Sequence, residues 1–380
     1  MIIGGGIGGL TAAAALIQAG FECVVYEQAP TLEPVGAGLT LWNNALYVLK
    51  LLSLAEPVIK AGVILREAEI TTQDGRLLNR ASTGALEARL GVPAIGIHRA
   101  SLQQSLVAGL PEGVLRTGKV LVKIEQDHDC VTAYFADGSQ DSADLLVAAD
   151  GIHSLVRKSL FPVAAIRYAG YTAWRGVARG EFDLPFGRAN ESWGAGSRFG
   201  MLWINRAEVY WFATANTSQD QQYTSEENKG LLLERFRDWH SPIERLLSQT
   251  PAGEILHNDI IDFQPLKSWW SGRAILIGDA AHATTPNIGQ GACQAIESAY
   301  ALASFLKRHS GNHENAFQEY QLYRQARTAW ITRQSWLLGS VAQWDKPLLC
   351  SLRNWLVRLA GSSSRSVLEK AAGYQSMLRE

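Results

Sequence analysis

The first 27 residues constrain the fold of this chain more than any other feature. Apolar residues 1–3 precede the turn GGGIGG at 4–9. An Ala/Leu-rich helical pattern then runs to Gly20, and an apolar strand pattern ends at Glu27. Strand, glycine turn, helix, strand and terminal carboxylate, in this order, are the parts of a dinucleotide-binding βαβ unit. We therefore expect an α/β fold that begins with a Rossmann-type domain.

Three glycines of that turn form a G-x-G-x-x-G pattern with separate tasks. Gly4 permits a tight turn, Gly6 lets a pyrophosphate approach the backbone, and Gly9 lets the helix pack closely on the strand. The free N–H groups at the helix start favour a phosphate. Glu27 follows about 20 residues later, where a carboxylate accepts hydrogen bonds from a ribose. We assign Glu27 and its neighbour Gln28 to cofactor binding.

Three residues in the middle of the chain extend the predicted cofactor site. Arg99 opens a predicted helix, and its guanidinium can neutralise phosphate or ribose oxygens. Val120, at the start of a predicted β-hairpin, is also assigned to cofactor binding. Asp150 follows the apolar strand pattern 145–149, at the strand end where nucleotides bind in α/β sheets.

The last motif lies near residue 280, in the segment GDAAHATTPNIGQG at 278–291. Asp279 can accept a ribose hydroxyl. The helix that starts around Gly289 presents free N–H groups and a positive pole, which suits the N1–C2=O edge of a flavin. Small residues permit a flat ring to approach closely. The residues assigned to cofactor binding here are Asp279, Pro286, Gly289, Gln290 and Gly291.

Together these motifs resemble the class A flavoprotein monooxygenases, which share the para-hydroxybenzoate hydroxylase fold. The resemblance covers most of the chain, with GxGxxG at 4–9, DGxxSxxR at 150–157, and GDAAHxxxPxxGQG at 278–291 in the order of the family. Salicylate hydroxylase-like and FAD-dependent urate hydroxylase-like members look closest. The chain departs from the family at Ser298, which follows Glu297 where an acidic residue is usual. This departure puts a helix contact in doubt.

The resemblance implies non-covalent FAD, with NADH or NADPH as a transient co-substrate that has no Rossmann domain of its own. It implies that a small aromatic or N-heterocyclic substrate is hydroxylated with O2 through a flavin C4a-hydroperoxide. In family members, the positions that match Arg198 and Tyr210 face the substrate. An arginine there could bind an anionic or enolic oxygen, and the tyrosine could orient it. We therefore predict Arg198 and Tyr210 as catalytic residues.

The predicted nucleotide-binding pieces are interleaved with a mostly β insert. The expected architecture is a GxGxxG Rossmann-type FAD-binding domain interleaved with a mixed β-sheet substrate domain, followed by C-terminal helices. Residues 231–249 read as one helix, and tryptophans 193, 203 and 211 of the insert read mainly as core. The predicted domains are 1–66, 94–165 and 268–310 for FAD, 67–93 and 166–267 for substrate, and 311–380 for the helical region.

Composition excludes several other classes of function. The net charge of −1 gives no footprint for nucleic acid or for an acidic membrane surface, and no apolar run approaches the length of a transmembrane segment. Four scattered cysteines and no metal-ligand spacing favour a reducing cytoplasm and no metal. Only three residues precede the first glycine, so the first strand is short or preceding residues are missing. A monomer or a homodimer is expected.

Two alternative functions stay open on the sequence. One is a related flavin monooxygenase that oxygenates a polyketide or antibiotic scaffold, as tetracycline-modifying members do. The other is a flavin-binding protein without oxygenase turnover. A narrow polar pocket around Arg198 favours hydroxylation of a small aromatic molecule, and a broad open pocket favours the scaffold.

Overall fold

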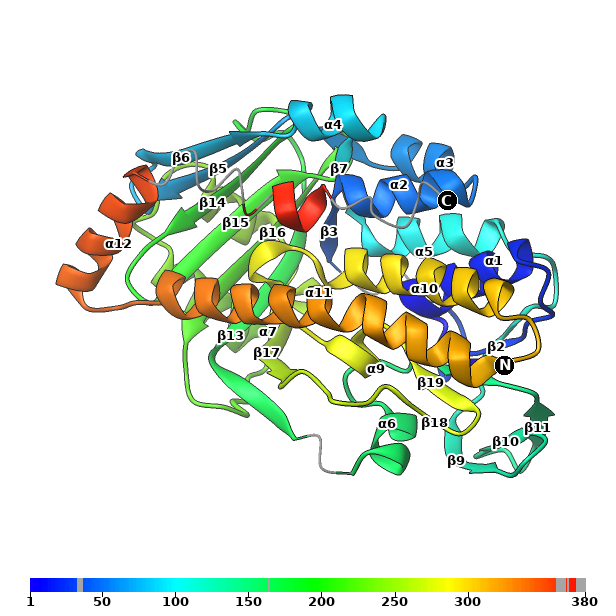
Figure 1. Ribbon diagram of the computed structural model, residues 1–380. Helices are drawn as coiled ribbons and strands as arrows, with labels where there is room; N and C mark the ends of the chain where they lie inside the picture. The colour runs from blue at the N-terminus through cyan, green and yellow to red at the C-terminus, as the bar shows by residue number, and fades with distance from the viewer. Residues whose placement is uncertain (33–36, 163–164, 360–366, 368, 374–380) are drawn as a thin grey trace.

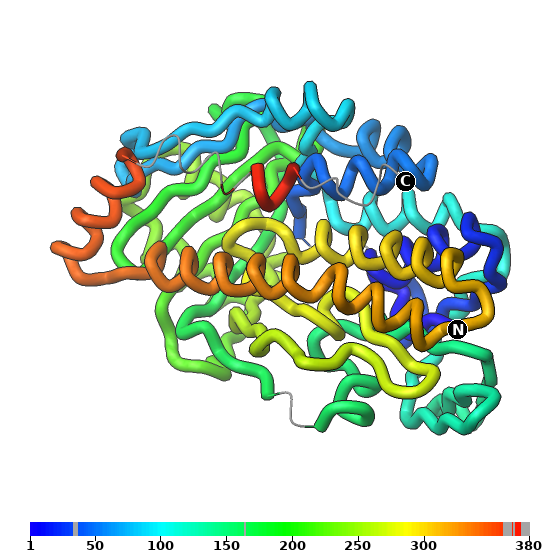
Figure 2. Tube along the Cα trace, in the orientation of Figure 1, coloured from blue at the N-terminus to red at the C-terminus, as the bar shows by residue number. Residues whose placement is uncertain are grey.

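Two large β-sheets and a layer of long helices make up the molecule (Figure 1). The structure is a computed structural model, and it describes residues 1–32, 37–162, 165–359, 367 and 369–373. Figure 2 follows the same chain as a tube and shows the N-terminal βαβ unit lying beside the long helices from the last third of the sequence.

The smaller of the two sheets carries the N-terminal βαβ unit. Its strand order is β18-β19-β12-β1-β2-β8, and every pair is parallel except β18 with β19. Its central strands are short and wholly buried, as expected for a parallel sheet covered on both faces. The strands are β1 (Ile2–Ile3), β2 (Val25–Tyr26), β8 (Leu115–Arg116), β12 (Leu146–Ala148), β18 (Trp270–Ser271) and β19 (Ala274–Leu276).

The larger sheet has seven strands in the order β17-β13-β16-β15-β14-β5-β6. One face carries Phe199 and Trp211, which pack on two helices, α7 (Ser225–Arg235) and α8 (Ile243–Gln249). The opposite face is directed toward the rest of the molecule. The strands are β5 (Glu67–Thr72), β6 (Leu77–Ser82), β13 (Ile166–Arg179), β14 (Arg188–Trp193), β15 (Ser197–Trp203), β16 (Glu208–Asn216) and β17 (Leu256–Phe263).

Two helices join the parts. Helix α10 (Gly291–Arg308) packs on α1 (Ile7–Gln18), and α11 (His313–Ala342) runs beside α10 and reaches the larger sheet (Figure 1). The remaining helices are α2 (Asn43–Leu51), α3 (Ala55–Lys60), α4 (Gly84–Leu90), α5 (Arg99–Ala108), α6 (Leu155–Leu160), α9 (Asp279–His282), α12 (Pro347–Leu359), and the 3-10 turns η1 (Ala252–Glu254) and η2 (Pro286–Ile288).

Two small antiparallel sheets complete the fold. One has the order β3-β7-β4, and the other has the order β11-β10-β9. The second packs on the parallel sheet, where the ring of Phe135 lies 4.5 Å from that of Tyr26 between centroids. The strands are β3 (Gly38–Leu41), β4 (Val63–Leu65), β7 (Ala94–His98), β9 (Leu121–Gln126), β10 (Val131–Phe135) and β11 (Gln140–Ala143).

The architecture confirms the predicted fold class, a Rossmann-type unit interleaved with a mixed sheet and followed by helices. The domain boundaries stay predictions. The single helix predicted over 231–249 is wrong. Two helices occupy this stretch, and Pro242 lies between them, because proline lacks the N–H that a continuous helix would need. Tryptophans 193, 203 and 211 are buried, as predicted.

Within the described residues, helices that combine the length and the apolar character for crossing a bilayer are absent.

Candidate functional site

The glycine turn after β1 is held by backbone contacts that leave no room for a side chain at Gly4 or Gly9. Gly4 has φ +105°, and a Cβ there would lie 2.4 Å from the carbonyl oxygen of Ala149. A Cβ on Gly9 would lie 1.9 Å from the carbonyl oxygen of Gly4. A Cβ on Gly6, in contrast, would meet no described protein atom within 4 Å. The turn is therefore closed on the protein side and open at Gly6, as a close approach by pyrophosphate requires.

Glu27 closes the other side of the turn. Its carboxylate accepts hydrogen bonds from the backbone N–H of Gly5 at 2.6 Å and of Ala29 at 2.8 Å. Gln28 is exposed at the same strand end. Val120 is also exposed, and it follows Lys119, whose N–H donates to the Glu27 carbonyl at 2.8 Å. Glu27, Gln28 and Val120 therefore lie close together, and their contact with a ribose stays a prediction.

Three distant motifs converge on this turn. Ala295 of α10 lies close to two of the glycine turns. The Cβ of Ala295 would be 3.3 Å from a Cβ added to Gly8 and 3.2 Å from a Cβ added to Gly278. The Gln103 side chain, one turn into α5 from Arg99, donates to the Gly5 carbonyl at 2.7 Å. The 150–157 motif follows β12, which pairs with β1. Glycine-lined turns from both ends of the sequence thus border one region.

Two aspartates of this region have pKa values raised above the ordinary value of an aspartate. Desolvation raises the pKa of Asp150, whose Oδ2 accepts from the Val156 N–H at 3.3 Å while its buried Oδ1 has no partner among the described residues. Desolvation also raises the pKa of Asp279, and the charge of Arg99 opposes this rise. Asp279 is nevertheless solvent-accessible. A ligand can therefore reach its carboxyl group.

The start of α10 offers hydrogen-bond donors to the same region. Gly289 has φ +63°, and a Cβ there would lie 2.9 Å from Nε1 of Trp42. This indole N–H and the buried amide Nε2 of Gln290 both lack a partner among the described residues. Gly291 then begins the helix, and Pro286 opens the preceding 3-10 turn. These donors and the helix pole fit an electron-rich ring edge.

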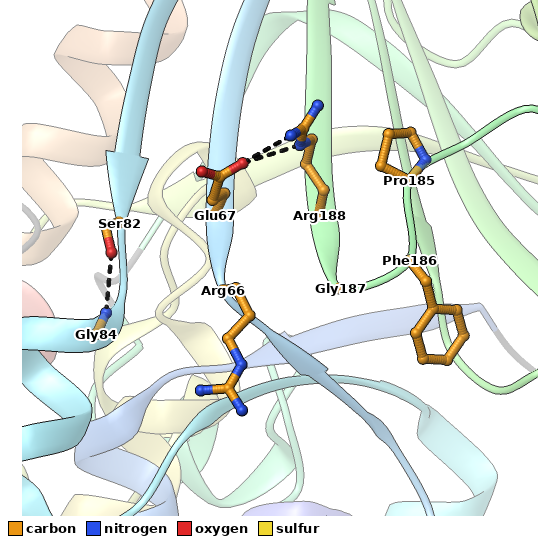
Figure 3. A pocket seen from close by; sticks show the side chains of 8 residues that line it. All are labelled: Arg66, Glu67, Ser82, Gly84, Pro185, Phe186, Gly187 and Arg188. Atoms are coloured by element: carbon orange, nitrogen blue, oxygen red, sulfur yellow. Dashed lines mark hydrogen bonds and ion pairs between the residues drawn. The ribbon is translucent and has the colours of Figure 1, made fainter.

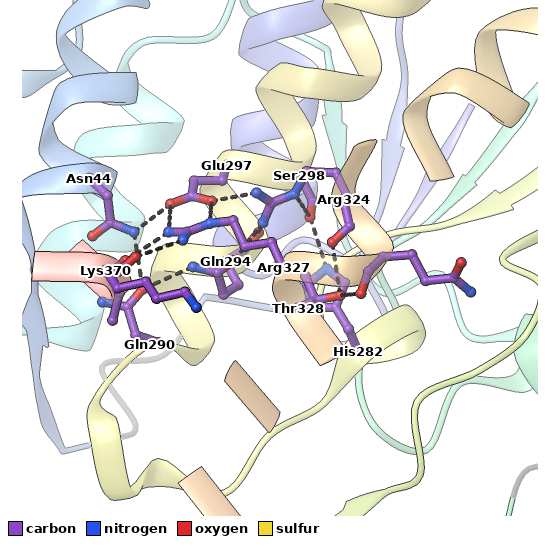
Figure 4. A network of polar contacts seen from close by, with 12 residues as sticks. Asn44, His282, Gln290, Gln294, Glu297, Ser298, Arg324, Arg327, Thr328 and Lys370 are labelled. Carbon is purple, nitrogen blue, oxygen red and sulfur yellow. Dashed lines mark hydrogen bonds and ion pairs between the residues drawn. The ribbon is translucent and has the colours of Figure 1, made fainter. Parts of the chain in front are cut away.

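A buried ion network holds this helix start in place (Figure 4). Glu297 accepts from Asn44 at 2.6 Å and from Arg327 at 2.7 and 2.8 Å, and it also pairs with Arg324. Burial alone would raise the pKa of Glu297, but Arg327 and Arg324 lower it to about 2. Asn44 also donates to the Gln290 side chain at 3.0 Å, so the ion network reaches the helix start directly.

The helix contact that Ser298 put in doubt is present. The Ser298 hydroxyl accepts from Arg324 at 3.2 Å and lies 2.9 Å from Nε2 of His282. Burial lowers the pKa of His282 to about 3, so this imidazole is neutral and acts as a structural link. Glu297 supplies the carboxylate that holds α11 to α10.

The inner face of the larger sheet carries the predicted catalytic residues. Cross-strand pairing places Arg198 opposite Thr214 and Tyr210 opposite Leu202. Arg198 is 2% exposed. Its guanidinium donates to Gln343 at 2.7 Å, to Glu191 at 3.0 Å and to Asn287 at 2.8 Å.

Tyr210 is 7% exposed, and burial raises the pKa of its phenol while the neighbouring Arg175 opposes the rise. Arg175 is itself half-buried and pairs across strands with Phe212, so both side chains share the inner face with Tyr210. Phe212 lies over Gly200, where a Cβ would be 2.0 Å from its ring. Sequence reasoning did not select Arg175 or Phe212. The two-residue alternation from Arg198 and Tyr210 could have found Phe212.

A separate hollow lies at the edge of the larger sheet (Figure 3). Its charged groups pair with protein partners. Arg188 contacts Glu67 at 2.8 Å, and Arg66 contacts Glu87 at 3.0 Å. No residue of the cofactor motifs lines it. Across the part of the chain that the structure describes, no cluster of three His, Cys, Asp or Glu side chains could hold a metal ion.

Known proteins are similar to this chain in sequence and in fold. A family model described as "FAD binding domain" matches residues 1–335. Aurachin C monooxygenase/isomerase of Stigmatella aurantiaca is 37% identical over 95% of this chain and 94% of its own. 2-Heptyl-3-hydroxy-4(1H)-quinolone synthase of Pseudomonas aeruginosa is 34% identical over 97% of this chain and 96% of its own. The crystal structure of Klebsiella pneumoniae HpxO with FAD and uric acid superposes with a TM-score of 0.89 at 28% identity, covering 96% of this chain and 94% of that one.

These matches agree with the geometry of the site. The open backbone at Gly6, the unpartnered oxygen of Asp150 and the donors at the start of α10 fit the pyrophosphate, ribose and ring of FAD. The chain belongs to the class A FAD-dependent monooxygenase family, whose members hydroxylate aromatic and heterocyclic compounds.

Proposed function

We propose that this enzyme hydroxylates a neutral aromatic N-heterocycle that carries an aliphatic chain, with NADH or NADPH as reductant. The balanced reaction converts substrate, O2, NAD(P)H and a proton into hydroxylated substrate, NAD(P)+ and water. FAD, when bound, supplies the chemistry that joins the reductant to O2. The route through a flavin C4a-hydroperoxide stays a prediction, as do a cytoplasmic location and the monomeric or dimeric state.

The observation that carries the proposal is the neutralised charge of Arg198. Glu191 pairs with its guanidinium, and Gln343 and Asn287 take two more of its donors. Arg198 is buried and Glu191 is half-buried, and a guanidinium already paired with a carboxylate attracts a second anion weakly. This arrangement disfavours a carboxylate-bearing or otherwise anionic substrate. It supports a neutral one.

The apolar character of the inner sheet face supports the aliphatic chain. Val177, Leu202 and Tyr210 form a buried cluster there. Trp42 and Phe212 pack against the cluster and are half-buried. Such a surface gains about 25 cal/mol for each Å² of apolar area that a ligand covers. A fused aromatic ring with an alkyl chain matches it better than a small polar molecule does.

The relatives point in the same direction. The printed name of one of them, 2-heptyl-3-hydroxy-4(1H)-quinolone synthase, describes a quinolone ring with a seven-carbon chain and a ring hydroxyl. A ring of that type is neutral and carries one N–H and one carbonyl. Arg175 and Tyr210 lie where they could donate to such a carbonyl.

We assign different tasks to the two residues predicted as catalytic. Tyr210 orients the polar end of the substrate together with Arg175. Arg198 acts as a positioning residue, because its guanidinium fixes Glu191 and also Asn287, which follows Pro286 beside the start of α10. The packed inner face excludes water from the reacting atoms.

A substrate panel tests the proposal. NAD(P)H oxidation by the FAD-loaded enzyme is measured with 2-alkyl-4-quinolones of increasing chain length, with salicylate and with urate, and products are analysed by mass spectrometry. We expect the alkylquinolones to stimulate oxidation most and to gain one oxygen atom. Stronger stimulation by salicylate or urate, with oxygen incorporated, would contradict the neutral-substrate proposal.

A further inference from the structure

Helix α12 exposes an unusual amount of apolar surface. Five of its thirteen residues are large apolar side chains that face solvent. Monomeric proteins scatter such residues singly, and contiguous apolar patches mark interaction sites. The five residues, called here the α12 stripe, are Leu348 at 86% exposure, Leu352 at 45%, Trp355 at 57%, Leu356 at 45% and Leu359 at 62%.

The stripe is continuous because its members recur at intervals of three and four residues, which places them on one side of a helix. The opposite side of α12 is fixed to the protein. Arg353 is buried and donates to the carbonyl oxygens of Ala342 at 2.8 Å and of Gly194 at 3.0 Å. Asn79 of β6 donates to the Val357 carbonyl at 3.1 Å. These bonds hold the stripe toward solvent.

The sequence that directly follows α12 is poor in large apolar side chains. Residues 360–366 read AGSSSRS, which contains no large apolar side chain. The chain is then anchored elsewhere, because Arg327 donates to the Lys370 carbonyl at 3.0 Å, and Arg89 of α4 donates to the Gly373 carbonyl at 2.9 Å. Figures 1 and 2 show the helical turn around residue 370 beside α10 and α11, away from α12.

The area of the stripe is too small for a stable contact with a second copy of the chain. A thirteen-residue helix is about 20 Å long and about 10 Å wide, so its outer face offers roughly 200 Å². A stable protein–protein interface needs about 800 Å² from each partner. A lipid surface has no such requirement, because each apolar side chain that enters it contributes separately.

We propose that α12 lies flat in the interface of a lipid bilayer and attaches this enzyme to the membrane surface. Leucine and tryptophan on one side of a helix are the side chains that enter the boundary between headgroups and acyl chains. Helix α12 contains no Asp or Glu. Exposed Arg358 lies near its C-terminal end, and exposed Lys346, next to exposed Asp345, lies just before its N-terminal end. The exposed charges beside the stripe therefore sum to +1, although the whole chain carries −1, and we expect the bilayer to be one with anionic headgroups.

The contacts of α12 connect this surface to the substrate-facing sheet. Arg353 lies over the ring of Trp193, 5.4 Å from its centroid, and Trp193 pairs across strands with Arg198. The N–H of Gly196 donates to the Trp344 carbonyl at 3.0 Å, just before α12. The membrane would thus lie beside the strand ends that carry Arg198. This placement suits a lipophilic substrate, but the attachment itself does not depend on the proposed function.

Vesicle co-sedimentation of the full-length FAD-loaded enzyme tests the attachment. We expect binding to vesicles of phosphatidylethanolamine and phosphatidylglycerol, and weaker binding to phosphatidylcholine. The double variant Leu352→Ser/Trp355→Ser should bind at least about tenfold more weakly, since each large side chain contributes separately. The matched control is Leu322→Ser, which removes an exposed leucine of α11 outside the stripe and should bind like the wild type. Arg358→Glu keeps the stripe and should weaken binding to the anionic vesicles alone.

Three results would overturn the proposal. The first is no sedimentation of the wild type with either vesicle. The second is equal binding by the double variant, with its fold verified by circular dichroism and retained FAD absorbance. The third is a dimer in vesicle-free analytical ultracentrifugation that the double variant dissociates, which would assign the stripe to a second copy. NAD(P)H oxidation with a water-soluble substrate is measured alongside, so that loss of catalysis and loss of attachment are told apart.

Discussion

The nucleotide-binding turns are lined by backbone atoms, whereas the inner face of the larger sheet is lined by side chains. Around Gly4, Gly6 and Gly9 the site is made of backbone, and a Cβ on Gly4 or Gly9 would meet main-chain atoms at 2.4 Å or less. On the larger sheet the site is made of side chains, with Phe212 lying over Gly200 and Arg198 held by Glu191. The shape of the glycine turns therefore fits one class of ligand. On the inner face of the larger sheet, substitution of side chains can change which ligand binds.

The same comparison explains which region tolerates substitution. A side chain added to a turn lined by backbone atoms is expected to lower the affinity for FAD. The side chains on the inner face of the larger sheet can rearrange after a substitution. Substitutions there are expected to change the affinity for substrate and not the affinity for FAD. Substitutions in the two regions should therefore change either FAD affinity or substrate affinity, and not both.

The largest effect is expected behind the nucleotide region, at Glu297. Glu297→Ala leaves Arg324 and Arg327 without their buried carboxylate, and breaking a buried pair costs about 3–5 kcal/mol. We expect the free energy of unfolding, measured by urea denaturation, to fall by that amount. Glu319→Ala, on the exposed part of α11, is the control and should change stability by less than about 1 kcal/mol. Equal losses in both variants would show that the buried network does not hold the helices together.

The next largest effect is expected on the inner face of the larger sheet, at Gly200. Gly200→Ala puts a Cβ 2.0 Å from the Phe212 ring and should displace that ring at a cost of about 1–3 kcal/mol. We expect the KM for substrate to rise about tenfold, while the Kd for FAD, measured by fluorescence titration, stays unchanged. Loss of FAD in this variant would mean that the two regions are not independent.

Gly6→Ala tests the reverse pattern. A Cβ at this position meets no described protein atom within 4 Å, so the fold should tolerate it while the pyrophosphate loses its close approach. We expect FAD affinity to fall at least about tenfold, or about 1.4 kcal/mol, with the melting temperature of the apoprotein unchanged. Gly230→Ala, whose Cβ also meets nothing within that distance, is the matched control and should keep FAD binding intact. Unchanged affinity in Gly6→Ala would remove the turn from the cofactor site.

The last effect is a pH dependence of stability, which is smallest near neutral pH and grows as the pH falls. His282 has its pKa lowered by burial to about 3, against an ordinary value of about 6.5 in the unfolded chain. Its contribution is complete above pH 6.5 and declines as the pH falls toward 3, because the unfolded chain binds the proton first. The slope should reach about 1.4 kcal/mol per pH unit. Urea denaturation of His282→Gln should show a shallower decline over this range, and exposed His128→Gln should match the wild type.

The sequence locates the glycine turns of the candidate site for a physical reason, and their contact with FAD stays a prediction. Glycine spacing, strand ends and helix starts are local features, so Gly4, Gly9, Asp150 and Gly291 could be located without knowing the fold. The partners of Arg198 could not, because Glu191, Asn287 and Gln343 reach it from three other elements. Arg175 was not assigned to the site, since the sequence alone does not show that its side chain shares the inner face with Tyr210.

The helix contact at Ser298 illustrates the same limit. The sequence pattern marked the lost acidic residue, but the compensating pairs of Glu297 with Arg324 and Arg327 depend on how α10 and α11 are packed. Pro242 was a local signal for a helix break, but the helical pattern over 231–249 was interpreted as one continuous helix.

Equilibrium titration of the apoprotein with FAD tests the central claim most directly, with wild type, Gly6→Val and Gly291→Val compared. If both glycine turns, from opposite ends of the sequence, hold the same molecule, the wild type binds one FAD per chain and each single variant loses that same FAD while remaining folded. If either variant retained full stoichiometry and affinity, the two turns would not share one cofactor.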